Sequence, residues 1–169
     1  MSSVVPDGWN EPRVRDLFTL NTKSVVPNDS PQEKFTYFSL PAYDEFGTSI
    51  EVYGSEIESN KFEINDTSVL VSKLNPRKPR VMYAKPEELR ACASTEFMSF
   101  VPIESNGVSL NYFTHYFFSE LFQKRLELVA TGSTNSHVRV SPKETTNWRI
   151  AVPPLPEQKK IASILTSVD

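Results

Sequence analysis

Thirteen prolines interrupt this chain of 169 residues, whereas glycine occurs only five times. Proline fixes its own φ angle, has no amide hydrogen to donate, and disfavours the helical conformation in the residue before it. The prolines therefore exclude long helices over much of the sequence and favour short elements joined by rigid corners. We expect an α+β fold rather than a helical bundle, in one domain, because the length is close to that of an average domain.

Two periodicities predict the main elements. Alternating apolar and polar residues indicate strands at 35–40, 68–72, 95–101, 137–141 and 148–152. Apolar residues recur at steps of three and four from Leu110 to Ala130, which predicts one long amphipathic helix. Pro156 and the apolar residues after it predict the start of a second helix over the last thirteen residues. The expected architecture is a twisted, largely antiparallel sheet, one long packed helix at about 110–130 and a short C-terminal helix.

Several function classes find no support in the sequence. No apolar run approaches the ~18 residues that span a bilayer, and the first ten residues do not resemble a secretion signal, so we expect a cytoplasmic protein. Cys92 has no second cysteine to pair with, and with His115 and His137 it matches no usual zinc spacing, so we expect no metal site. We expect His115 to be a core or boundary side chain rather than a general base. No glycine-rich turn or N-P-P-Y-like tetrad indicates a site for S-adenosylmethionine.

The charge of the chain is unevenly distributed. The net charge is −3, and residues 1–70 hold five basic and twelve acidic side chains, but residues 71–90 hold six basic and only two acidic ones. Lysine and arginine neutralise phosphates, and arginine or asparagine can also read a base edge. The alternative is an ordinary solvated loop. The candidate DNA-binding residues of this stretch are Lys73, Asn75, Arg77, Lys78, Arg80 and Lys85.

A polar segment at 130–139 follows the long predicted helix. Small hydroxyl and amide side chains beside free backbone amides bind phosphate well. A helix-capping turn alone would also explain Gly132 and Ser133. The candidate DNA-binding residues of this segment are Ser133, Thr134, Asn135, His137 and Arg139.

The C-terminal helix carries an apolar stripe made of Ile161, Ile164, Leu165 and Val168. A helix this short is only marginally stable alone, so another surface must cover the stripe. We expect that surface to belong to a partner; the alternative is the chain's own core. The expected boundaries are a domain at 1–152 and the start of a spacer helix at 153–169.

Four segments in this order resemble the specificity subunit of type I restriction-modification systems. They are PDGW at 6–9 with VRDL at 14–17, SVLVSKLNP at 68–76, CASTEF at 92–97 and VPPLPEQKKIA at 152–162. The last is similar to the family's entry into its conserved coiled-coil helix. Together the four segments extend over nearly the whole chain.

The resemblance implies one target recognition domain and the start of that helix. It implies sequence-specific recognition of double-stranded DNA without catalysis, in a complex with a modification (methyltransferase) subunit and, through it, a restriction subunit. S-adenosylmethionine, ATP and magnesium are then expected on those partners only. The family's subunit has two recognition domains and this chain has one, so it is either a fragment or a half-subunit that pairs as a homodimer. The alternative is a protein-interaction module that binds modification or specificity subunits and modulates their assembly; an enzyme is a third hypothesis.

Overall fold

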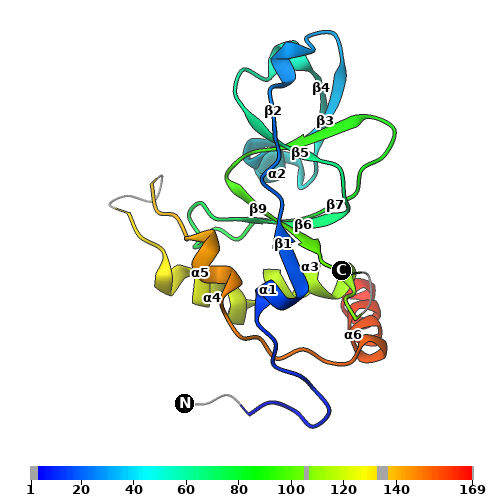
Figure 1. Cartoon of the computed structure of the whole chain (residues 1–169), viewed down its shortest axis with the longest axis vertical. Helices are drawn as coiled ribbons and strands as arrows, with labels where there is room; N and C mark the ends of the chain where they lie inside the picture. The colour runs from blue at the N-terminus through cyan, green and yellow to red at the C-terminus, as the bar shows by residue number, and fades with distance from the viewer. Residues whose placement is uncertain (1–3, 105–106, 133–136, 169) are drawn as a thin grey trace.

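Two β-sheets and a group of short helices make up the computed structural model, which describes residues 4–104, 107–132 and 137–168 (Figure 1). The four-stranded sheet is antiparallel throughout and has the order β1-β9-β6-β7. Its strands are β1 (Phe18–Leu20), β9 (Phe97–Pro102), β6 (Ser68–Ser72) and β7 (Val81–Ala84). The α+β class is therefore confirmed, but with two sheets where we expected one.

The five-stranded sheet has the order β2-β5-β8-β3-β4. Its strands are β2 (Ser24–Val25), β5 (Lys61–Ile64), β8 (Arg90–Ala93), β3 (Lys34–Phe38) and β4 (Ile50–Tyr53). Among the described strands only the β3–β8 pair is parallel, so the prediction of largely antiparallel pairing is correct. The chain passes directly between the sheets from β1 to β2, from β5 to β6 and from β8 to β9, and each of these connections is short.

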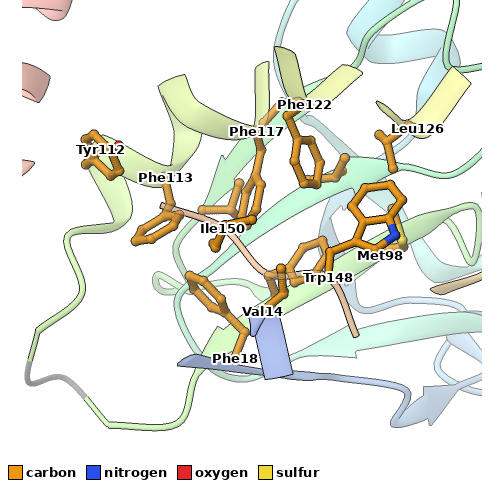
Figure 2. Close-up of a cluster of buried hydrophobic side chains, with 14 of the residues drawn as sticks. Val14, Phe18, Met98, Tyr112, Phe113, Phe117, Phe122, Leu126, Trp148 and Ile150 are labelled. Carbon is orange, nitrogen blue, oxygen red and sulfur yellow. The ribbon is translucent and has the colours of Figure 1, made fainter. Parts of the chain in front are cut away.

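The main core lies between the four-stranded sheet and the helices at the lower end of Figure 1. Figure 2 shows aromatic side chains from three distant parts of the sequence pointing toward one another there. Phe100 of β9 stacks on Phe117, with ring centroids 4.8 Å apart, and Phe18 of β1 meets Phe113 edge to face at 5.0 Å. Rings in these arrangements contribute beyond the area that they bury.

The predicted helix at 110–130 is two helices, α3 (Leu110–Phe118) and α4 (Glu120–Val129). Ser119 between them is extended, with φ −61° and ψ 150°, and its hydroxyl oxygen accepts from the amide of Phe122. In one continuous helix Phe117 and Phe122 would point about 140° apart, at 3.6 residues per turn. The break lets both rings enter the core, where their centroids are 4.9 Å apart.

Other differences from the predicted elements come from serine caps and single bridges. Ser39 ends the strand predicted at 35–40 and caps α2 (Leu40–Phe46), and Ser141 caps α5 (Pro142–Thr146), a helix that we did not predict. The strands predicted at 137–141 and 148–152 form only isolated bridges, such as Leu74 with Arg139 and Arg13 with Arg149. The short α1 (Val14–Leu17) precedes β1, and two 3-10 turns lie at Pro27–Asp29 and Gly54–Glu56.

The C-terminal helix α6 (Leu155–Ser167) is fastened to the domain through Gln158. The side chain of Gln158 is 1% exposed. Its oxygen accepts from the amide of Ser109 at 2.9 Å, and its nitrogen donates to the carbonyls of Gly107 at 2.8 Å and Pro153 at 2.9 Å. Near it, the indole nitrogen of Trp9 donates to the carboxylate of Glu157 at 3.1 Å. The first turns of α6 are thus continuous with the core. None of the described helices is both long enough and apolar enough to cross a membrane.

We expect Gln158→Leu to destabilise the domain, because it leaves a part-buried amide, a part-buried carbonyl and a buried carbonyl without partners. Each buried group left unsatisfied costs about 1–3 kcal/mol, so the loss is on the order of 2–4 kcal/mol in the free energy of unfolding. In a thermal melt the midpoint should fall by roughly 4–16 °C. The exposed Lys160→Ala on the same helix is the control, and equal midpoints for the two variants would contradict the anchoring role.

Candidate nucleic-acid interface

Residues 73–80, called the basic loop from here on, form the tip of the β6–β7 hairpin. Val71 pairs with Val81, and the amide of Ser72 donates to the carbonyl of Arg80 at 2.9 Å, which closes the loop. The strand β6 is buried along its whole length, so its position is fixed by the core on both faces. The loop is therefore a short cationic projection on a rigid base.

The polar segment after α4 returns against the basic loop. The amide of Asn75 donates to the carbonyl of Val138 at 2.8 Å, and the amide of Val140 donates to the carbonyl of Lys73 at 2.9 Å. Two further backbone bonds join Thr131 and Arg139. The two candidate segments, about sixty positions apart in the sequence, thus make one surface, which we call the basic face. Three of the candidate residues, Ser133, Thr134 and Asn135, lie outside the described residues.

Asn75 fixes the shape of the basic loop. It has a φ of 46°, in the left-handed region that asparagine tolerates better than most residues. Its side-chain oxygen is buried and has no hydrogen-bond partner among the described residues. This geometry gives Asn75 a role in positioning the loop.

Arg80 anchors the basic loop instead of projecting from it. Its side chain is only 10% exposed, and its Nε and Nη2 donate to the two carboxylate oxygens of Asp44 in α2 at 2.8 and 3.0 Å. The Nζ of Lys78 lies 3.1 Å from the same carboxylate. The hydrogen bonds from Arg80 hold the pKa of Asp44 at about 2. The sequence predicts Arg80 as a DNA-binding residue, but the structure buries its guanidinium against Asp44, and a buried guanidinium needs its carboxylate.

The other two arginines of the basic face are also paired. Arg77 is 70% exposed, and its Nε lies 3.1 Å from a carboxylate oxygen of Glu127 in α4. Arg139 donates from Nε and Nη2 to the carboxylate of Glu96, at 2.9 Å for the shorter bond. Glu96 raises the pKa of Arg139, and its carbonyl accepts from the amide of Lys73 at 2.9 Å.

Sequence reasoning missed these carboxylates. Asp44 is followed by another acid, Glu45, a pattern typical of a solvated face, and Glu127 lies in the helical region. Glu96 belongs to the CASTEF segment at 92–97, and its signal was that motif. It holds both halves of the basic face together, which gives the motif a structural purpose.

Lys85 and His137 have different positions. His137 is exposed and directly precedes Val138, whose carbonyl accepts from the amide of Asn75. Lys85 follows the far end of β7, about 16 Å from Arg80 at 3.3 Å per residue. There it lines a separate hollow of about 380 Å³ with Thr48, Tyr83 and Glu87. The structure therefore does not bring Lys85 into the basic face.

The predicted partner-binding stripe is divided by the structure. Ile161 is half-buried against the core, whereas Ile164, Leu165 and Val168 are 55%, 42% and 77% exposed. We call these three residues the exposed patch of α6. His115 of α3 lies 3.1 Å from the hydroxyl of Thr166, beside this helix.

Neither a metal cluster nor a reactive thiol is evident in the parts of the chain that are described. Within them, no group of three or more histidine, cysteine, aspartate or glutamate side chains is placed to hold a metal ion. Cys92 in β8 is buried, and burial raises the pKa of its thiol to about 12, so the thiol is protonated at neutral pH.

The two-sheet domain and its C-terminal helix have the fold of solved S subunits of type I restriction-modification systems. The chain belongs to the family of type I restriction modification DNA specificity domains, whose pattern matches residues 6–169. No match is found among curated protein sequences.

Solved structures share the fold. The HsdS subunit from Thermoanaerobacter tengcongensis superposes with a TM-score of 0.80 at 19% identity, over 98% of this chain and 43% of that one. A chain from a study of complex assembly and conformational transition of the type I R-M system gives 0.80 at 20% identity, over 99% and 43%. The S subunit of the type I system from M. genitalium gives 0.62 at 14% identity, over 99% and 40%. The chain thus spans less than half the length of these relatives.

Asp44→Asn should destabilise the domain at neutral pH, because it leaves Arg80 buried without its carboxylate. A carboxyl whose pKa falls from 3.8 to about 2 on folding contributes about 2 kcal/mol at neutral pH. That contribution is complete above pH 4 and is lost as the pH falls through about 2. Urea unfolding at several pH values should therefore show a gap between wild type and variant that narrows below pH 4. A gap independent of pH would contradict the assignment.

Proposed function

We propose that this domain recognises a sequence in double-stranded DNA as one half of the specificity subunit of a type I restriction-modification complex. The observation that carries the proposal is the joining of the two candidate segments into the basic face. Family membership supports it, since the family is defined by DNA specificity. The domain directs chemistry that its partners perform and catalyses none itself.

In this proposal the exposed cations of the basic face contact phosphates, and the loop tip enters a groove. The side chains of Arg77 and Lys78 are 70% and 57% exposed. Lys73, His137 and Arg139 belong to the same face. Phosphate contacts set the position of a protein on the duplex, and base-edge contacts select the sequence. Asn75 and Arg80 act by holding the loop in shape. Ser133, Thr134 and Asn135 stay candidates for DNA contacts.

The proposed partners bind at α6. The exposed patch of α6 is apolar and lies beyond the anchored first turns, where a helix of another subunit could cover it. We assign it to the modification (methyltransferase) subunit, which carries the restriction subunit, or to a second copy of the chain in a homodimer. S-adenosylmethionine, ATP and magnesium are assigned to those partners, and the complex to the cytoplasm.

A protein-interaction module without DNA binding is the second candidate, and the exposed patch of α6 favours it. The two functions differ in how binding to a duplex responds to salt. The logarithm of the affinity for duplex DNA falls with the logarithm of salt concentration in proportion to the phosphates neutralised. A module that does not bind DNA shows no such dependence.

We expect the double variant Arg77→Gln with Lys78→Gln to bind all duplexes more weakly, because two exposed cations are removed. The salt slope should fall by about 0.9 for each phosphate that is no longer neutralised, which is roughly two in total. Thermal stability should change little, since exposed ion pairs contribute about 0–1 kcal/mol. Fluorescence anisotropy with labelled duplexes over a range of salt measures the affinity and the slope, and a thermal melt measures the stability.

The control for this variant is Lys159→Gln with Lys160→Gln, which removes the same charge from α6 on the far side of the molecule in Figure 1. The slope of the control should match that of the wild type. An unchanged slope in the loop variant would exclude the basic loop from the DNA interface.

Ile164→Asp with Leu165→Asp should abolish co-purification with the modification subunit and any self-association. Both side chains are exposed, so the thermal midpoint of the domain should stay nearly unchanged. Ile161→Asp is the contrasting variant, because this half-buried side chain packs on the core and its replacement should lower the midpoint. If the double variant unfolds the domain instead, the exposed patch of α6 belongs to the core and the docking assignment is wrong.

A further inference from the structure

Among the described residues, three cationic side chains at the tip and edge of the basic face are already paired with carboxylates of this chain. Arg77 is paired with Glu127, Lys78 with Asp44, and Arg139 with Glu96. A phosphate that approaches any of them must displace or share a carboxylate. The basic face is therefore partly neutralised before DNA arrives.

The three carboxylates differ in what else they do. Asp44 fixes the buried guanidinium of Arg80, and the Glu96 residue holds Lys73 through its carbonyl as well as Arg139 through its side chain. Glu127 stands on the outer surface of α4, is 43% exposed, and reaches across to the basic loop through Arg77. An exposed pair of this kind contributes little to folding. The contribution to folding therefore explains why Asp44 and Glu96 are paired, but it does not explain the pairing of Glu127.

We propose that Glu127 is a specificity-determining residue that lowers the affinity of the domain for phosphates of arbitrary sequence. The inference rests on the proposed function. The carboxylate occupies the Nε of Arg77, so non-specific DNA gains less from this cation than its exposure suggests. Binding then depends more on the base contacts that only a correct sequence supplies, because phosphate contacts carry no sequence information.

Electrostatics sets the size of the effect. Glu127 lies 3.1 Å from the Nε of Arg77, so a phosphate bound to the same guanidinium lies within a few ångströms of the carboxylate. Two like charges about 5 Å apart in water repel enough to change an equilibrium constant about fourfold. Salt screens this repulsion, because the Debye length is about 10 Å at 0.1 M ionic strength. The loss of affinity that Glu127 causes is therefore largest at low salt.

The test measures binding of a short labelled duplex of random sequence to wild type, Glu127→Gln, Arg77→Gln and the double variant. Glu127→Gln should bind this duplex about fourfold more tightly at low salt and steepen the salt slope by up to about one. In the Arg77→Gln background the same substitution should give little gain, because the cation that Glu127 restrains is absent. Glu58→Gln, which removes an exposed charge between the 3-10 turn at Gly54–Glu56 and β5, should bind like the wild type.

Three results would overturn the inference while leaving DNA binding intact. They are an affinity of Glu127→Gln no higher than that of the wild type, an equal gain in the Arg77→Gln background, and an equal gain from Glu58→Gln. The first result would show that Glu127 does not lower the affinity for DNA. The second would show that Glu127 does not act through Arg77, and the third that any loss of negative charge raises the affinity. If neither wild type nor Glu127→Gln binds the duplex while both melt cooperatively, the proposed function itself fails, and this inference with it.

Discussion

The ion pair between Asp44 and Arg80 joins the two halves of the molecule at the point where the basic face begins. Asp44 lies in α2, which follows a strand of the five-stranded sheet, whereas Arg80 ends the hairpin loop of the four-stranded sheet. A buried guanidinium is costly unless a carboxylate neutralises it, so neither partner can move without the other. A core cluster that includes Phe38, Leu70 and Met82 packs the same two layers together. The orientation of the basic loop is thus set by the junction of the sheets.

The electrostatics of the face follow from this construction. A chain with a net charge of −3 presents a cationic surface because residues 71–90 hold six of its eighteen basic side chains and only two of its twenty-one acidic ones. Several of those acids return to hold the bases in place, at Asp44, Glu96 and Glu127. Held side chains lose less conformational freedom when a ligand binds, and this offsets part of the affinity that pairing removes. In the proposed function, this pairing makes the basic face favour selective binding over strong binding.

Sequence patterns predicted the elements whose conformation is determined by neighbouring residues in the sequence. Residues 68–72 form a strand with the predicted bounds, because a buried apolar run ended by a proline-rich loop has few alternatives. The helix break at Ser119 was not predicted, since the periodicity on either side suits a single helix, and only the positions of Phe117 and Phe122 in the core favour the break. Similarly, nothing in the sequence separates Arg77 from Arg80. One is exposed and the other buried because Asp44 arrives from a distant helix.

The hydrogen bonds of Gln158 fix the rotation of the C-terminal helix about its own axis relative to the domain. The helix is about 20 Å long at 1.5 Å per residue, and its first turns cannot roll, because one side chain is bonded to three backbone groups of the domain. Each residue added after the anchor would turn the exposed patch of α6 by about 100° around the helix axis. In the proposed function, a partner on that patch would be held at one angle to the basic face. The number of residues between Gln158 and Ile164 would then set the geometry between that partner and the bound DNA.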